Sequence, residues 1–404
     1  MLDLAEFFSI QQRLLRHTLS KHRRFLYERI DWSERLLGLV GGRGTGKTTL
    51  LLQHLSGQGT PEGEILYLSA DHILVEALGL YEIGRDFFQG GGRLLVVDEI
   101  HKSQDWARRI KNLYDAFPSA RIVFSGSSAL KLQLGKADLS RRAVYYTLPT
   151  LSLREYLLLD TGIEHQSFTL TDLLQNHARL AAEILKSGPV LGHFKAFLDH
   201  GAYPFFTEGA DNYHSRLRNV VEKILYEDIP PTTGMRYTGV PVLKKILFQI
   251  ASSPPFQLNI ERLASDLGIT KPTLYSYLTH LETAGLIAGV MPEGSGATLT
   301  RKPAKLFLEN TNLQKTIGSE LRLEDPLGTV RETFFAGQLR NAGHKVRAAR
   351  QGDFIVDDQH LFEVGGRKKS AKQLAGRKNA LIVKDDIETG SKNVLPLWLF
   401  GFLY

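Results

Sequence analysis

Cysteine is absent from this chain of 404 residues. Its absence excludes a disulfide, a thiolate zinc site and a thiol nucleophile. No apolar run reaches the roughly 18–20 residues that a membrane-spanning helix needs. The first residues, MLDLAE, lack the basic start and the apolar core of a secretory signal. The sequence therefore predicts a cytoplasmic protein with no membrane segment.

The chain is too long for one ordinary domain, and two to four domains are expected. Hydrophobic residues make up 43% of it, which is enough to build cores. The formal net charge of +7 fits contact with nucleic acid, and it fits an ordinary basic surface equally well. The basic runs 13–24 and 367–378 are either solvated helix faces or phosphate-contacting patches.

Residues 41–48 read GGRGTGKT and fit G-x-x-x-x-G-K-[ST], the pattern of a phosphate-binding loop. An apolar run at 36–40 predicts a strand before the loop, and a helix is predicted to follow it. The glycines let backbone N–H groups close around a phosphate chain, and the helix N-terminus adds a positive dipole end. We expect Lys47 to reach the β- and γ-phosphates of ATP and Thr48 to bind Mg²⁺. The predicted nucleotide-binding residues are Gly41, Gly42, Arg43, Gly44, Thr45, Gly46, Lys47, Thr48 and Thr49.

Three further apolar runs, at 65–68, 94–97 and 122–124, each end in polar residues. Nearly continuous apolar strands are typical of a parallel sheet that is buried on both faces. Polar residues at the carboxyl ends of such strands are where open α/β sheets bind ligands. The sequence therefore predicts an α/β fold with a parallel sheet.

Asp98 and Glu99 follow the run at 94–97 directly. Asp98 is the expected partner of the Mg²⁺ ion. Glu99 projects in a different direction, where it can orient and deprotonate an attacking water. Together with Lys47, this pair predicts hydrolysis rather than binding alone.

Two other groups of polar residues are candidates for contact with the nucleotide. One of Ser125, Ser127 and Ser128 could sense the γ-phosphate by hydrogen bonding, or all three could form a polar turn. Arg141 and Arg142 precede an apolar run at 144–146. An arginine there could stabilise transition-state charge, in its own subunit or a neighbour's, or form a surface salt bridge.

These motifs resemble the AAA+ ATPases, in particular a prokaryotic family with a winged helix and a nuclease-like C-terminal domain. The matching segments are 42–48, 97–100, Trp106, 125–128, 140–142 and 148–156. The family usually has Gly-Arg where this chain has Arg141-Arg142, so Arg142 takes the family's position as a catalytic arginine. The resemblance implies the AAA+ strand order and assembly into a homo-oligomer. It implies a parallel AAA+ P-loop sheet with a helical lid, a winged helix and a C-terminal α/β nuclease-like domain.

Four domains are expected on this basis. They are the AAA+ ATPase domain at 1–158, the helical lid at 159–236, the winged helix at 237–300 and the nuclease-like domain at 301–404. Pro230 and Pro231 are predicted to end the last helix of the lid.

Residues 240–291 predict a helix-turn-helix followed by a wing. Asn259 can cap the second helix, the third runs over 271–284, and the wing tip is expected at 293–296. This module could bind duplex DNA, or it could pack on the ATPase domain or on a neighbour. The side chains predicted to face DNA are Lys271, Thr273, Tyr275, Ser276 and His280.

Glu332, Asp353 and Glu363 resemble the metal site of restriction-type nucleases. That site usually ends Glu-x-Lys, because strand residues two apart share a face. Here the third position is Gly365, and Lys368 or Lys369 could substitute or be surface charges. We favour a nuclease-like fold without cleavage.

The leading functional hypothesis is a Mg²⁺-dependent ATPase that acts as a molecular switch or motor on DNA or on a partner protein. One alternative is an ATP-gated, metal-dependent DNA nuclease, against which Gly365 argues. The other is an ATP-responsive DNA-binding or scaffold protein, against which Glu99 argues.

Overall fold

The computed structural model describes residues 2–17, 21–57, 63–130, 139, 141–252, 259–294, 303–320, 327–368 and 380–404. The chain divides into two compact units. The first joins Met1–Pro149 with Glu227–Met235, and the second joins Thr150–Tyr226 with Arg236–Tyr404. Of the helices in the described part of the chain, none is long and apolar enough to cross a membrane.

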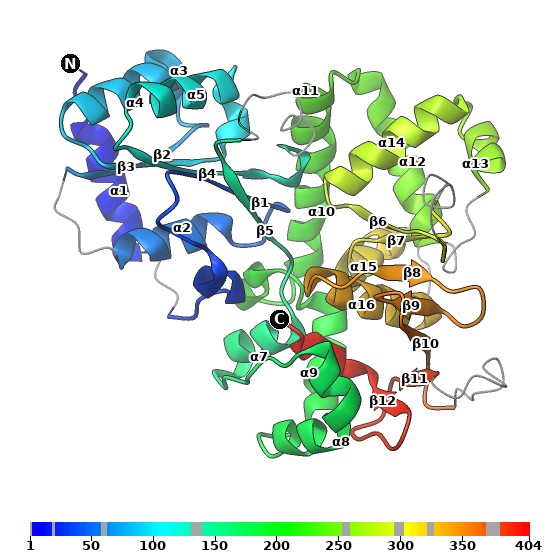
Figure 1. Ribbon diagram of the computed structural model, residues 1–404. Helices are drawn as coiled ribbons and strands as arrows, with labels where there is room; N and C mark the ends of the chain where they lie inside the picture. The colour runs from blue at the N-terminus through cyan, green and yellow to red at the C-terminus, as the bar shows by residue number, and fades with distance from the viewer. Residues whose placement is uncertain are drawn as a thin grey trace. The chain divides into compact units, whose positions relative to one another are not determined.

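The first unit is built on a five-stranded parallel sheet in the order β2-β3-β4-β1-β5 (Figure 1). Because every strand is parallel, their carboxyl ends meet at one edge. The predicted strands and the predicted α/β sheet are confirmed. The strands are β1 (Leu36–Gly41), β2 (Ile65–Ser69), β3 (Leu94–Asp98), β4 (Arg121–Ser127) and β5 (Val144–Leu148).

Successive side chains of each strand point to opposite faces of the sheet, so the unit has one hydrophobic core on each face. In β3, Leu95 and Val97 face one core, whereas Leu94 and Val96 face the other. Helices cover both faces of the sheet, as Figure 1 shows. On one face lie α3 (Ile73–Leu78), α4 (Leu80–Gln89) and α5 (Trp106–Ala116), and on the other α2 (Lys47–Ser56) and the 3₁₀ helix η1 (Phe25–Arg29). Helix α1 (Ala5–His17) packs along β2.

The two prolines do not end a helix, and that prediction was wrong. Helix α10 (Tyr213–Lys223) runs into a π-helical turn, η5 (Ile224–Asp228), and α11 (Ile229–Thr233) follows directly. The prolines lie in the first turn of α11, where a missing backbone N–H breaks no helical hydrogen bond. Gly234, with φ of 73°, ends α11 in the left-handed conformation.

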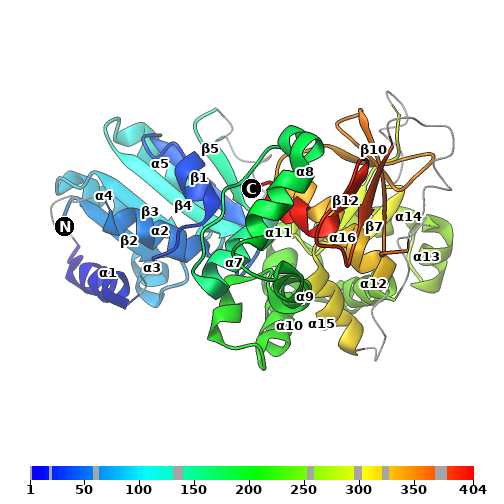
Figure 2. The same cartoon turned by 90° about the horizontal axis from the view of Figure 1, so that it is seen from below.

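The second unit begins with α7 (Leu153–Thr161), which has a capping box between Ser152 and Glu155. The Ser152 hydroxyl also donates to the carbonyl of Tyr404 at 3.1 Å, which ties the helix to the chain's last residue. Figure 2 shows α8 beside β12 (Val394–Pro396). The second unit also contains α8 (Leu170–Leu185), α9 (Val190–His200), α15 (Thr311–Glu320) and α16 (Leu327–Asn341).

The predicted helix-turn-helix elements are observed within this unit. They are α12 (Val240–Ala251), α13 (Ile260–Asp266) and α14 (Lys271–Thr283), followed by β6 (Ile287–Val290), which pairs antiparallel with β7 (Lys305–Leu308). The Asn259 side chain caps α13, accepting from two backbone N–H groups at 3.1 Å. The predicted wing tip extends to Ser295 and Gly296, which lie outside the described residues. The winged-helix assignment itself stays a prediction.

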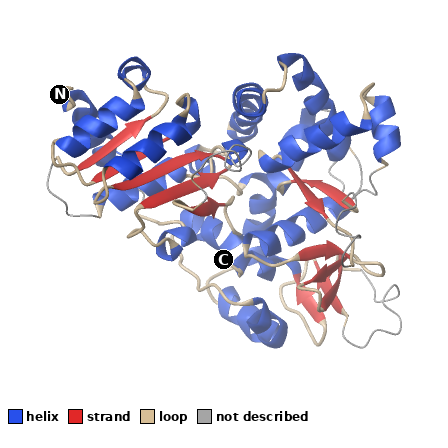
Figure 3. Cartoon of the chain, turned by 45° about the horizontal axis from the view of Figure 1, so that its top comes forward, coloured by secondary structure: helices blue, strands red, loops and turns tan. Residues whose placement is uncertain are grey.

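A second five-stranded sheet, in the order β12-β11-β10-β9-β8, lies in the C-terminal part (Figure 3). Its other strands are β8 (Val346–Ala348), β9 (Phe354–Val356), β10 (His360–Gly365) and β11 (Leu381–Lys384). Strands β10, β11 and β12 are parallel, and β8 and β9 are antiparallel additions. This mixed α/β region is compatible with the nuclease-like prediction and does not test it.

Candidate nucleotide-binding site

The loop between β1 and α2 has a backbone that requires glycine at several positions. Gly44 and Gly46 have φ of 79° and 93°, in the left-handed region that strains other residues. A Cβ on Gly41 would lie 2.4 Å from the Leu148 carbonyl oxygen. Helix α2 begins at Lys47, so its N-terminus opens directly from the loop. This is the geometry of a phosphate cradle.

Lys47 is buried, with 4% of its surface exposed. Its Nζ donates to the carbonyls of Gly41 and Gly42, at 3.1 and 2.9 Å. Burial lowers the pKa of Lys47, and the negative charges of Glu99 and Asp98 act in the opposite direction. The Lys47 side chain is thus held at the loop by two backbone carbonyls, within the electrostatic influence of two acids.

Asp98 ends β3 and is 2% exposed. Its carboxylate accepts hydrogen bonds from the hydroxyls of Thr48, at 2.5 Å, Tyr67, at 3.1 Å, and Ser125. Burial and the Asp98 charge raise the pKa of Tyr67, so this hydroxyl stays protonated and donates. Sequence reasoning missed Tyr67, because nothing in an apolar strand marks one tyrosine as a partner of a distant acid.

Thr48 and Asp98 offer the hard oxygen ligands that Mg²⁺ prefers. No group of three or more histidine, aspartate or glutamate side chains that could hold a metal occurs among the described residues. Mg²⁺ in phosphate sites is usually bound by one or two protein oxygens together with the substrate's phosphates. The two side chains present therefore fit a Mg²⁺ ion that arrives with a nucleotide.

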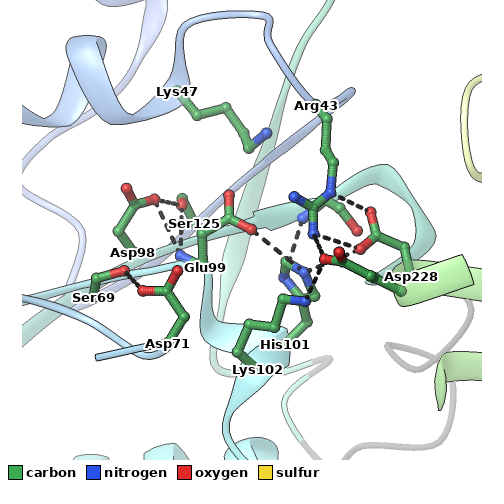
Figure 4. A network of polar contacts seen from close by, with 12 residues as sticks. Arg43, Lys47, Ser69, Asp71, Asp98, Glu99, His101, Lys102, Ser125 and Asp228 are labelled. Atoms are coloured by element: carbon green, nitrogen blue, oxygen red, sulfur yellow. Dashed lines mark hydrogen bonds and ion pairs between the residues drawn. The ribbon is translucent and has the colours of Figure 1, made fainter. Parts of the chain in front are cut away.

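Glu99 adopts the left-handed conformation, with φ of 51° and ψ of 40°. For a residue with a side chain this costs about 1–2 kcal/mol, and such strain is often found at functional sites. The bend sends the Glu99 carboxylate away from that of Asp98 (Figure 4). Its side chain is 21% exposed, so water can reach part of it, although the Oε2 atom is buried.

Arg43 of the loop is bound to Asp228, which lies 185 positions further along the chain. The guanidinium donates from Nε and Nη2 to the two carboxylate oxygens, at 2.9 and 2.8 Å (Figure 4). Burial raises the pKa of Asp228, but the adjacent His101 ring and the Arg43 guanidinium outweigh it and hold the pKa below its ordinary range. Next to this pair, Lys102 Nζ lies 3.2 Å from Glu227 Oε2. Sequence reasoning missed Asp228, for which no motif exists.

His101 lies between Glu99 and Asp228. Its Nε2 is 3.4 Å from Glu99 Oε2 and 3.6 Å from Asp228 Oδ1. Its Nδ1 accepts a hydrogen bond of 3.5 Å from the backbone N–H of Ser127. Nε2 of His101 and Oε2 of Glu99 are both buried without a hydrogen-bond partner among the described residues, so these two approaches are close polar contacts and not hydrogen bonds.

The three candidate serines differ in their surroundings. The Ser125 hydroxyl contacts Asp98 and accepts from the Glu99 N–H at 3.2 Å, so it orients the two acids. The Ser127 hydroxyl is buried without a hydrogen-bond partner in the described part of the chain. Ser127 lies beside Gly41 in the sheet register, and Ser128 follows it in a 3₁₀ turn.

Arg142 lies at the opposite edge of the sheet from the phosphate loop. It precedes β5, whose carboxyl end is paired with Gly41 at the loop. Its guanidinium binds Asp115 on α5, at 3.0 Å. A strand of five or six residues spans about 17–20 Å. The Arg142 side chain is thus bound to α5 rather than to the loop, and its catalytic role, in its own site or a neighbour's, stays a prediction.

The basic runs are only partly surface patches. Arg24 is buried and donates to the carbonyls of Thr45 and Pro149, at 2.5 and 2.9 Å, so it supports the phosphate loop from behind. Arg367 and Lys368 are exposed, whereas 369–379, with Lys369, lie outside the described residues. On α14, Tyr275 is 43% exposed, and Lys271 pairs with Glu261 at 2.5 Å.

Two of the three acids of the predicted nuclease site, Glu332 and Asp353, lie beside a lysine. Lys305 Nζ lies 2.6 Å from Glu332 Oε2 and 3.8 Å from Asp353 Oδ1. The other oxygen of Asp353 accepts from the Val364 N–H at 2.8 Å. Glu363 is fully buried. A cation of the protein thus lies where the sequence pattern suggested a metal ion.

Residues 33–157 match the family described as "AAA domain", and residues 192–315 match one described as "Domain of unknown function (DUF8612)". The chain is 28% identical over 407 residues to "Uncharacterized protein MJ1637" of Methanocaldococcus jannaschii, covering 91% of this chain and 84% of that protein. The AAA match covers the sheet and the phosphate loop. It supports an AAA+ ATPase domain of the P-loop type.

Two solved structures are also similar. DnaA of Aquifex aeolicus with AMPPCP is 15% identical, covers 69% of this chain and 88% of its own, and has a TM-score of 0.27. The Hsp104–ADP complex of S. cerevisiae is 15% identical, covers 70% of this chain and 38% of its own, and has a TM-score of 0.25. Scores this low carry no argument about this chain.

Proposed function

We propose that the protein is a Mg²⁺-dependent ATP hydrolase that works as a molecular switch or motor. The observation that carries this proposal is the meeting of Lys47, Thr48, Asp98 and Glu99 at one edge of the sheet, although they come from two segments of the chain. A site that only bound ATP would not need Glu99, whose backbone is strained and whose carboxylate is partly accessible to water.

Each residue has a defined task in this proposal. Backbone N–H groups of the loop and Lys47 bind the phosphates of ATP. Thr48 and Asp98 hold Mg²⁺, which supplies Lewis acidity and neutralises phosphate charge. Glu99 orients a water and accepts its proton as the water attacks the γ-phosphate in line. The buried Ser127 hydroxyl is the candidate for a contact with the γ-phosphate.

The target is DNA or a partner protein. Support for DNA comes from helix α14, which follows a capped helix and a tight turn and exposes Tyr275. The net charge of +7 points the same way. If Arg142 acts in a neighbouring subunit's site, the ATP site of a monomer lacks its catalytic arginine. Assembly into a homo-oligomer is therefore part of the proposed function.

Phosphate release from ATP tests the proposed chemistry. Lys47→Ala removes a charge-assisted contact, so nucleotide binding should weaken by about 1.5–3 kcal/mol. Glu99→Gln should keep binding and lose turnover. Glu76→Gln, at an exposed carboxylate on α3, is the matched control and should behave as wild type. If Glu99→Gln hydrolysed ATP at the wild-type rate, its assigned role would be wrong. Duplex and single-stranded DNA added to the same assay test the target.

A further inference from the structure

A chain of four polar residues joins the phosphate loop to the carboxylate that we assign to water activation. Arg43 of the loop binds Asp228, Asp228 lies beside His101, and His101 lies beside Glu99 (Figure 4). All four belong to the first unit. Asp228 and His101 have no task in the chemistry proposed above.

The hydrogen bonds of His101 determine which ring nitrogen carries the proton. Nδ1 accepts from the Ser127 N–H, so in the neutral ring the hydrogen is on Nε2. Nε2 is the atom that lies between the carboxylates of Glu99 and Asp228. The ring therefore presents a donor to Glu99, and it is 4% exposed, so it has little room to turn.

Asp228 is held more firmly than His101. It is 1% exposed and receives two charge-assisted hydrogen bonds from one guanidinium, an arrangement that is directional as well as strong. Any shift of Arg43 therefore shifts the carboxylate against which His101 packs. His101 Nε2 in turn lies 3.4 Å from Glu99 Oε2, an oxygen that has no hydrogen-bond partner among the described residues.

We propose that Asp228 and His101 are positioning residues for ATP hydrolysis, which tie the orientation of the Glu99 carboxylate to the conformation of the phosphate loop. The inference rests on the proposed function. Under this coupling, Glu99 is oriented to accept a proton when the phosphate loop and its Arg43 have the conformation seen in this structure.

Asp228→Asn is the first test, because it keeps the shape of the side chain and removes its charge. Without that charge Arg43 is less fully neutralised, since Glu227 at 3.6 Å becomes its nearest acidic partner. An anionic nucleotide should therefore bind as tightly as before or more tightly. The kcat should nevertheless fall by about tenfold or more, since Glu99 loses its orientation. A merely structural role would weaken binding of a non-hydrolysable ATP analogue and lower kcat together. Glu76→Gln, at an exposed carboxylate on α3, is the matched control and should keep the wild-type kcat.

His101 provides the second test. His101→Leu should lower kcat without weakening analogue binding, and His101→Gln should recover part of the rate because its amide can donate to Glu99. The double variant His101→Leu with Asp228→Asn should be no slower than the slower single variant, since both residues act through Glu99.

The outcomes separate this inference from the proposed function. An active wild type with an unchanged kcat in Asp228→Asn would overturn the inference and leave the function standing. A wild-type rate no higher than that of Glu99→Gln would overturn both. Should Asp228→Asn fail to fold, His101→Leu decides, and its wild-type kcat would overturn the inference.

Discussion

The Thr48 hydroxyl donates a hydrogen bond of 2.5 Å to Asp98 Oδ2. Thr48 lies in the first turn of α2, and Asp98 is the last residue of β3. The contact therefore joins the phosphate loop to a strand that is not adjacent to β1 in the sheet. It also brings together the two oxygens that we assign to Mg²⁺.

Asp98→Asn should abolish turnover that depends on Mg²⁺, because an amide is a much weaker ligand than a carboxylate. Thr48→Val should raise the Mg²⁺ concentration needed for half-maximal rate, and EDTA should stop the wild type. The measurement is phosphate release as a function of Mg²⁺ concentration. Tyr67→Phe removes a hydrogen bond to Asp98 but no metal ligand, so its Mg²⁺ dependence should stay normal. Full activity of the wild type in EDTA would contradict the metal assignment.

Arg142 should act on the site of a neighbouring subunit, because its own site is at the far edge of the sheet. Arg142→Ala should lower kcat, by up to about 10³-fold if it stabilises transition-state charge. Mixing Arg142→Ala with Glu99→Gln subunits should restore part of the rate. Arg141→Ala is the matched control. A protein that stays monomeric by light scattering and active at all dilutions with ATP would exclude this role.

Lys271 should contribute to DNA binding if α14 faces the duplex. Its ammonium would exchange Glu261 for a phosphate. In Lys271→Ala the slope of log K against log salt should become shallower by about one, because the variant binds one phosphate fewer. The measurement is duplex binding at several salt concentrations. Lys195→Ala, at an exposed lysine on α9, is the control. Equal salt slopes in all three proteins would place any DNA site elsewhere.

The C-terminal sheet should not cleave DNA. Lys305 neutralises Glu332 and Asp353, which weakens the attraction of these acids for a metal ion, and position 365, where the nuclease pattern has a lysine, is a glycine. Supercoiled plasmid should stay intact with Mg²⁺ or Mn²⁺, with or without ATP. Nicking that disappears in Asp353→Ala would promote the nuclease alternative.

His54 should make the first unit less stable in mild acid. Burial, with a smaller contribution from Arg121 and Arg23, lowers the pKa of His54 to about 4, from 6.5. Its ring stacks on Trp32 at 3.8 Å. The folded state binds fewer protons than the unfolded state between these values, so this stability is complete above 6.5 and is lost as the pH falls toward 4. The difference in melting temperature between pH 7.5 and pH 5 should be smaller in His54→Gln than in the wild type. An equal difference in the two proteins would show that His54 does not cause the loss of stability in acid.

Local patterns were sufficient for the architecture of the site. The loop glycines, Lys47 and Thr48 belong to one short segment, and the apolar runs are nearly continuous, as in strands buried on both faces. Neighbours along the chain therefore determine both the loop and the strands. The helix-turn-helix elements followed from the same kind of signal. The prediction for Pro230 and Pro231 was wrong because a proline is as compatible with the start of a helix as with its end.

The sequence by itself determined that a phosphate loop is followed by two acids at the end of a buried strand. Only the tertiary structure decided what surrounds them. The Tyr67–Asp98, Lys305–Glu332 and Arg43–Asp228 contacts join positions 31, 27 and 185 apart. Contacts at such separations depend on how strands and helices pack, and no periodicity or motif in one segment specifies its partner in another.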